Sequence, residues 1–271
     1  MKPLQHGLLI CALLAMDVPL HAQLLFSQDF SSSSLVSDYV NLGSPGSNQW
    51  NAIGSSGAGV ILGISGGALT YTRTTANTGS FSRTTDFSPP PSALIYKFDL
   101  TVSGNTVAQT TAAVFQLGSG FGTANAAEAN ANVYARLGVN FSASNGSFSL
   151  RDLGAAVNSS PLTGTQTIFL ALNNSGTTQN YTGPDAVVHS LANDTINVWA
   201  GTSIVFSAMN PTTATQSITD LKFAFTAGTG SIALDNISVA AIPEPSTSAA
   251  ILGVVSLAGV LLRRRRLPRA T

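Results

Sequence analysis

The stretch ALIYKFDLTV, residues 93–102, places an apolar side chain at every second position. Successive side chains of an extended strand point to opposite faces, so these apolar residues would share one face. The polar and small residues between them would form the other face. The pattern therefore predicts a β-strand that is buried on the side of Leu94, Tyr96, Phe98, Leu100 and Val102.

Similar short runs recur on both sides of this stretch, separated by Gly, Ser and Asn turn signals. Ser65-Gly66-Gly67, the Asn-Gly turn at 144–146, and 227–230 each predict a hairpin between the strands that flank them. Only 123–131 offers a helical turn or two, and no long amphipathic helices connect the strands. We therefore predict an all-β, two-sheet antiparallel jelly-roll sandwich over residues 23–241. The expected strands are 60–64, 68–73, 93–102, 112–117, 132–141, 147–153, 166–172, 195–200, 203–208, 222–226 and 231–239.

Charged residues make up only 9% of the 271 residues, and the formal net charge is zero. Five of the twelve basic residues fall in the last nine positions. Residues 23–242 therefore hold six basic and ten acidic residues, a net charge of −4. Nucleic-acid binding needs a basic face, so this composition argues against it.

The N-terminus has the pattern of a secretory signal peptide, residues 1–22. Lys2 precedes an apolar core of about ten residues at 7–16, and Ala22 offers a small residue at the cut. The competing interpretation is a buried N-terminal helix. Cys11 is the only cysteine and lies in this segment, so the mature chain would contain no disulfide. Signal peptidase is the expected processing partner.

The C-terminus, residues 242–271, has three parts in a fixed order. Pro243-Glu244-Pro245 is rigid and extended, because proline fixes φ and biases the preceding residue away from helix. An uncharged run at 246–262 is just long enough to span a membrane as a helix. The block that follows would stay in the cytoplasm by the positive-inside rule: Arg263, Arg264, Arg265 and Arg266.

This order resembles the PEP-CTERM sorting signal of exported proteins in Gram-negative bacteria that make exopolysaccharide. The resemblance implies recognition by an exosortase, a membrane-bound cysteine transpeptidase, near Pro243, Glu244 and Pro245. The protein would cross the inner membrane, remain anchored there for a time, and then reach the cell surface or extracellular matrix. Ile242 departs from the usual valine before the motif. An ordinary, permanent membrane anchor after a Pro-rich stalk is the competing interpretation.

The middle region more weakly resembles concanavalin A-like, carbohydrate-binding jelly rolls. The resemblance rests on LLFSQDF at 24–30, Gly67-Ala68-Leu69, and SIALDNISV at 231–239. It implies that the first and last strands lie together and that Asp29 and Asp235 hold a structural Ca²⁺, the only cofactor expected. Calcium takes carboxylate and carbonyl oxygens as ligands. The alternative is that Asp235 only bonds to a nearby backbone group.

Three aromatic residues are candidates for stacking on sugar rings: Trp50, Trp199 and Tyr181. Trp199 lies opposite the face of Ile196 and Val198, which is compatible with an exposed ring. Packing in the core is the alternative for all three. Catalysis has little support, because Glu128 is the only Glu of residues 23–241 and no Glu-x-Asp-x-Glu strand is present. His189, the only His after residue 22, is expected to be a polar surface residue.

We therefore expect a non-catalytic cell-surface or matrix protein that associates with exopolysaccharide. The alternatives are a secreted glycan-active enzyme of the jelly-roll class and an envelope protein whose tail is never cut.

Overall fold

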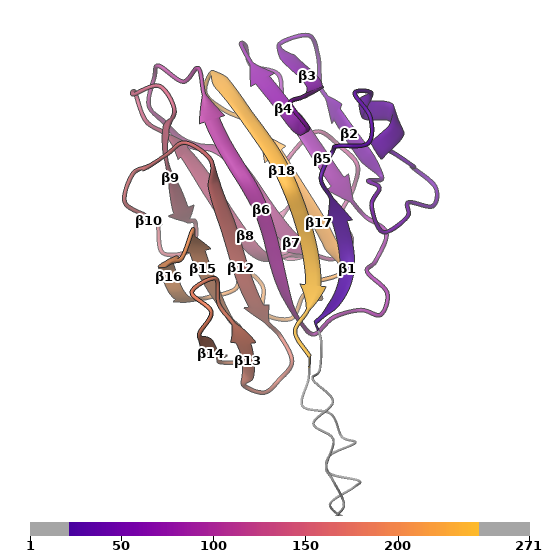
Figure 1. Cartoon of the computed structure of the whole chain (residues 1–271), viewed down its shortest axis with the longest axis vertical. Coiled ribbons are helices and arrows are strands. Elements are labelled where there is room, and N and C mark those ends of the chain that lie inside the picture. Colours follow the sequence, from indigo (N-terminus) through magenta and orange to yellow (C-terminus); the bar gives the residue numbers. More distant parts are fainter. Residues whose placement is uncertain (1–21, 244–271) are drawn as a thin grey trace, which may run out of the picture.

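Strands fill most of residues 22–243, the part of the chain that the computed structural model describes. Eighteen strands form two antiparallel sheets packed face to face, together with a separate two-stranded hairpin (Figure 1). The predicted two-sheet antiparallel jelly-roll sandwich is therefore confirmed. The signal core, the Arg block and most of the sorting motif lie outside the described residues. Within residues 22–243, no helix is long and apolar enough to span a membrane.

The first sheet has the order β16-β15-β12-β6-β18-β4-β3, and β1 also pairs with β18. β6 lies near its centre and covers the sequence stretch that alternates most regularly. Its strands are β1 (Gln23–Gln28), β3 (Val60–Ser65), β4 (Ala68–Arg73), β6 (Ala93–Ser103), β12 (Gln166–Asn173), β15 (Thr195–Ala200), β16 (Ser203–Met209) and β18 (Gly230–Ala241).

The second sheet has the order β10-β9-β8-β7-β17-β5-β2, and β11 also pairs with β9. The hairpin of β13 (Gln179–Thr182) and β14 (Val188–Leu191) forms no sheet with either of the others. The strands of the second sheet are β2 (Ala52–Ser55), β5 (Gly79–Arg83), β7 (Gln109–Gly118), β8 (Val133–Phe141), β9 (Ser147–Asp152), β10 (Val157–Asn158), β11 (Leu162–Thr163) and β17 (Asp220–Phe225).

The hairpin predicted across residues 227–230 is wrong. β17 pairs with β5 and β7 in the second sheet, whereas β18 pairs with β1, β4 and β6 in the first. The turn signal is real, but the chain uses it to cross between the sheets. The hairpins predicted at 65–67 and 144–146 are confirmed as β3–β4 and β8–β9.

The core between the sheets is crossed by a continuous series of aromatic rings. Phe98 of β6 stacks on Phe115 of β7 at 4.1 Å between ring centroids, and Phe115 contacts Phe223 of β17 at 4.9 Å. The series continues through Phe81 and Trp50. Each of these rings is completely buried, so they link both sheets through apolar contact.

The first and last strands lie together, as the resemblance implied. β1 and β18 are antiparallel neighbours, with Gln23 opposite Ala241. Both ends of the described chain therefore leave the sandwich at the same end, which we call the tail pole (Figure 1). The loop at 104–108 lies at the other end, since β6 runs away from the tail pole for eleven residues, about 33 Å.

Candidate functional site

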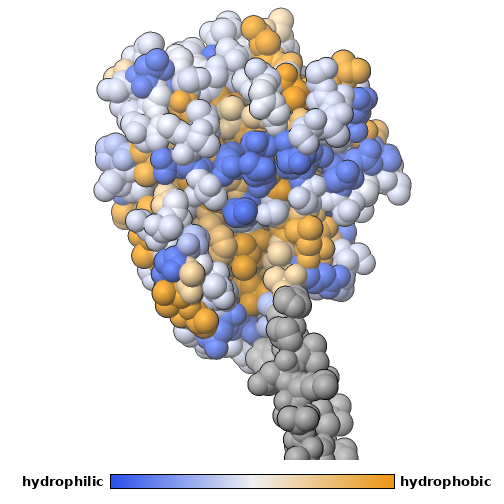
Figure 2. All heavy atoms as spheres, in the orientation of Figure 1, coloured by the Kyte–Doolittle hydropathy of each residue, from blue (hydrophilic) through white to orange (hydrophobic). Residues whose placement is uncertain are grey.

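The outward face of the first sheet carries a group of polar residues that we call the acidic belt: Asp29, Asp99, Thr167, Asp235 and Asn236. Figure 2 shows this face, with a hydrophilic band across its middle. Asp235 of β18 lies directly opposite Asp99 of β6, at the start of an irregularity in the register. Asn236 has a φ of 49°, in the left-handed region that Asn tolerates better than most residues.

Asn236 connects the two carboxylates of the belt. Its side-chain amide donates to Asp99 Oδ2 at 2.8 Å and to Asp235 Oδ2 at 3.3 Å. Thr167 Oγ1 donates to Asp99 Oδ1 at 2.5 Å. Burial raises the pKa of Asp235, and the charges of Asp99 and Asp29 raise it further. The Asn236 amide therefore holds two of the three belt carboxylates, Asp99 and Asp235, as neighbouring acceptors.

The charge of Asp29 acts on Asp235 within the belt, and the structural Ca²⁺ predicted at these two residues stays a prediction. Asp29 Oδ1 accepts from both the backbone N and the Oγ of Ser31, and Asp235 Oδ1 accepts from the Asn236 backbone N. Among residues 22–243, no three His, Cys, Asp or Glu side chains are placed to hold a metal ion. One oxygen of each carboxylate is therefore already bonded within its own turn, which leaves fewer free ligand atoms for calcium.

This geometry predicts the response of the protein to metal. We expect millimolar Ca²⁺, compared with a chelator, to leave the melting temperature unchanged within about 1 °C, because an ion that binds only the folded state would raise it. Differential scanning calorimetry of the wild-type protein measures this. A clear rise in melting temperature that is absent in Asp235→Asn would instead show that Asp235 helps to bind calcium.

The structure places all three predicted sugar-stacking residues in the interior, which corrects the exposed interpretation. Trp50 is 0% exposed and packs between Phe26 and Phe81. Trp199 and Tyr181 are 2% and 4% exposed. The predicted alternation around Trp199 does hold, and its ring points away from the core. However, the β13–β14 hairpin covers that side of the sheet and buries the Trp199 ring.

The β13–β14 hairpin is fixed to the sheet through Tyr181. Its Oη accepts hydrogen bonds from Trp199 Nε1 at 3.1 Å and from Asn197 Nδ2 at 3.0 Å, and its ring stacks on Phe169. His189 is partly exposed, as expected, and contacts the edge of Trp199. Its Nε2 lies 2.9 Å from Asp185 Oδ2. The pair therefore holds the tip of the hairpin.

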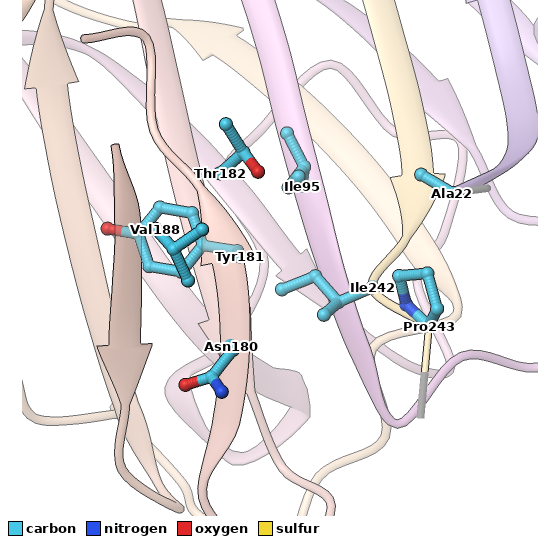
Figure 3. Close-up of a pocket in the computed structure, with 8 residues that line it drawn as sticks. All are labelled: Ala22, Ile95, Asn180, Tyr181, Thr182, Val188, Ile242 and Pro243. Atoms are coloured by element: carbon cyan, nitrogen blue, oxygen red, sulfur yellow. The ribbon is translucent and has the colours of Figure 1, made fainter. Parts of the chain in front are cut away.

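A hollow of about 410 Å³ opens on the same face beside the tail pole (Figure 3). The inner wall comes from β6 and the end of β18, and the opposite wall comes from the β13–β14 hairpin. None of the lining side chains is charged. The lining residues are Ala22, Ile95, Asn180, Tyr181, Thr182, Val188, Ile242 and Pro243.

Sequence reasoning missed a buried polar network on the outward face of the second sheet. Lys222 of β17 is 1% exposed, and its Nζ donates to Glu128 Oε1 at 2.5 Å and to the carbonyl oxygen of Gly122 at 2.9 Å. The loop at 119–132 lies over the sheet and supplies these partners. The rarity of Glu and Lys was the only sequence signal. Strand alternation does not reveal that the loop between β7 and β8 folds back over the outer face of its own sheet.

Residues 123–131 of this loop, where the sequence offers a helical turn or two, form one short 3-10 turn at their end. The backbone N of Glu128 donates to Gln116 Oε1 at 2.8 Å, and Asn125 Oδ1 accepts from Ser80 Oγ at 2.8 Å. These bonds to the sheet replace bonds within a helix, and only the short 3-10 turn η2 (Asn130–Asn132) forms.

The two ends of this loop come together where the backbone of Gly118 lies against the backbone of Asn132. A Cβ added to Gly118 would lie 2.0 Å from the carbonyl oxygen of Asn132, which is backbone and cannot rotate away. We expect Gly118→Ala to destabilise the protein by about 1–3 kcal/mol through overpacking. Gly63→Ala is the matched control, because a Cβ there meets no atom within 4 Å. Equal urea midpoints for the two variants would contradict the assignment.

Asp220 predicts a pH dependence of stability. Burial raises its pKa to about 6, with a further contribution from Asp86, while its Oδ2 accepts from the backbone N of Phe121. An acid with a raised folded pKa binds its proton more tightly in the folded state. Its stabilising effect is therefore complete below pH about 4 and is lost as the pH rises through 6.

We therefore expect Asp220→Asn to stabilise the protein at pH 8, by about 1–2 kcal/mol, and to have little effect at pH 4. The Asn oxygen can still accept from Phe121. Urea unfolding at both pH values measures the difference, and Asp38→Asn, at an exposed position, is the control. A larger gain at pH 4 than at pH 8 would refute the sign.

The topology and packing described above define the class of the protein as a two-sheet jelly roll. The chain is also similar to several solved structures, each with a TM-score below 0.5. One is a Bacillus subtilis protein of unknown function with a galectin-like fold. It is 9% identical, the match covers 80% of this chain and 96% of that chain, and the TM-score is 0.45. Another is an endo-1,3-beta-glucanase from Streptomyces sioyaensis: 13% identity, 82% and 97% coverage, TM-score 0.46. The cellulose induced protein Cip1 is similar at 11% identity, 79% and 96% coverage, TM-score 0.40. No protein-family model and no curated protein sequence matches the chain.

Proposed function

We propose that this is an exported, non-catalytic cell-surface or matrix protein, sorted through its C-terminal tail, whose jelly roll associates with exopolysaccharide. One observation carries the proposal: the pairing of β1 with β18 brings both ends of the described chain to the tail pole. The predicted signal cleavage after Ala22 and the sorting motif at Pro243 thus lie at one end of the domain. The sandwich extends about 33 Å beyond that end, toward the exterior.

The acidic belt is the surface that we propose for the polysaccharide. Sugar hydroxyls donate hydrogen bonds, and the belt offers them the remaining lone pairs of carboxylates that the Asn236 amide holds in position. Asp29 and Asn236 are exposed, and Asp99 and Asp235 are half-buried. The belt lies on an open face, where a chain of sugars can pass without entering a closed cavity.

A glycan-active enzyme is the second candidate, and one observation favours it. Asp99 and Asp235 are directly opposite each other on neighbouring strands, and the pKa of Asp235 is raised. A glycosidase uses such a pair, with one carboxyl kept protonated as the acid. The Asn236 amide, however, bonds to both carboxylates, which favours a binding role over an acid and base pair.

Intact mass and fractionation of the protein from its own host test the sorting part. We expect a mass that lacks residues 1–22 and everything after about residue 243, in the surface or matrix fraction. A mass that retains residues 249–271, found in the membrane fraction, would show a permanent anchor and overturn the sorting.

Binding and hydrolysis of the host exopolysaccharide test the role of the domain. We expect the wild-type protein to bind without releasing sugars, and Asn236→Gly to bind at least about tenfold more weakly. Glycine keeps the positive φ while removing the amide. Asp38→Asn, whose carboxylate accepts from Ser33 and not from a belt residue, is the control and should bind normally. Sugar release that is abolished by Asp235→Asn would establish the enzyme instead.

A further inference from the structure

One exposed apolar side chain, Val188, lines the hollow at the tail pole, and two more lie within two residues of its lining in the chain. Val188 and Leu24 are 66% and 62% exposed, and the neighbouring Val187 is 54% exposed. Figure 2 shows hydrophobic surface gathered on the lower part of this face, near the end of the described chain. Single exposed apolar residues are normal, but a group around an uncharged hollow marks an interaction surface.

The sequence fixes how far this surface lies from the predicted membrane span. Pro243 lines the hollow, and the apolar run begins at Ser246. Three extended residues cover at most about 10 Å. While the tail is in a bilayer, the pole is therefore held at the lipid headgroups.

We infer that the tail pole is a lipid-contacting surface, on which the domain rests against the bilayer while its tail is uncut. This inference rests on the proposed anchoring of residues 246–262. The occupant is a phospholipid surface, because the lining of the hollow carries no charge and the short linker leaves the pole facing the headgroups. Apolar residues at such a surface insert into the interface, with their polar neighbours in the headgroup region.

The charge of the hairpin tip agrees with this occupant. Asp185, the acidic residue nearest to Val187 in the chain, is paired with His189. At the hairpin tip, the Asp185 carboxylate is therefore hydrogen-bonded to His189 and does not point at the lipid without a partner. Cleavage near Pro243 would then separate the domain from its membrane anchor and allow it to leave the bilayer surface.

Site-specific labelling tests this inference in the chain that begins at residue 23 and keeps its uncut tail. The only cysteine lies in the predicted signal peptide, so the mature chain accepts one introduced cysteine as a unique label site. The test variant is Val188→Cys and the matched control is Val107→Cys, a valine 64% exposed at the opposite end of the sandwich. Each variant carries an environment-sensitive fluorophore, is reconstituted into phosphatidylcholine vesicles, and is checked for its native circular dichroism spectrum.

We expect brominated lipid to quench the label at position 188 at least about threefold more than the label at position 107. If the chain floats with the vesicles and the two labels are quenched equally, the pole does not rest on lipid and the inference fails. A label at 188 that is shielded from water but not quenched would show that another protein segment covers the hollow, which also overturns it. If the chain does not float with the vesicles, the anchoring itself is wrong, and the inference falls with it.

Discussion

Lys222→Met is expected to destabilise the protein by about 3 kcal/mol, because it leaves the carboxylate of Glu128 without its cation beneath the loop at 119–132. It also removes the donor to the carbonyl oxygen of Gly122. Breaking one side of a buried ion pair costs more than removing the pair, since the remaining charge stays desolvated. Urea unfolding at pH 7 measures the free energy of unfolding.

Two further variants separate the ion pair from the simple loss of a side chain. The double variant Lys222→Met with Glu128→Gln should recover much of the loss, because no unpaired charge remains. Lys97→Met, at an exposed position of β6, should stay within about 0.5 kcal/mol of the wild type. A double variant less stable than Lys222→Met would show that the unpaired charge of Glu128 is not the cause of the lost stability.

Phe115→Ala is expected to cost about 4 kcal/mol, because the ring connects the two sheets at the centre of the core. It stacks on Phe98 from the first sheet and contacts Phe223 from the second. Alanine would leave a cavity that no neighbouring ring can fill without leaving its own contacts.

The same unfolding assay distinguishes this role from that of a peripheral aromatic residue. Phe115→Leu fills part of the space and should cost about half as much. Phe169→Ala, beneath the β13–β14 hairpin, should cost less than Phe115→Ala, because it belongs to the smaller cluster outside the sandwich. A loss below about 2 kcal/mol for Phe115→Ala would show that the sheets do not depend on this ring.

The fold was predictable where one face of a strand is buried and the other is not. The alternation at 93–102 gave the strand β6, and the short turns gave β3–β4 and β8–β9. Sequence alternation did not predict β5, GSFSR at 79–83, because this strand is buried on both faces and its sequence does not alternate. The pattern of a strand reports its exposure, and a strand covered on both sides loses it.

The candidate site was less predictable, because it depends on contacts between distant segments. Asp29 and Asp235 were placed together by the expected pairing of the first and last strands, but Asp99 joins them only through the register of β6. Trp199 was expected to be accessible because its outward direction is visible in the sequence, whereas the hairpin that covers it is not. Lys222 was overlooked for the same reason, since its outward position usually means exposure to solvent.

The arrangement around β18 has a mechanical consequence. β6 borders one edge of β18, while β4 borders the first half of the other edge and β1 the second half. If the tail is held and the belt is attached to a polysaccharide, tension runs along β18 parallel to its length. Such a load shears the backbone hydrogen bonds on both edges together instead of opening them one after another. The strand nearest to the tether is therefore the one best placed to resist pulling.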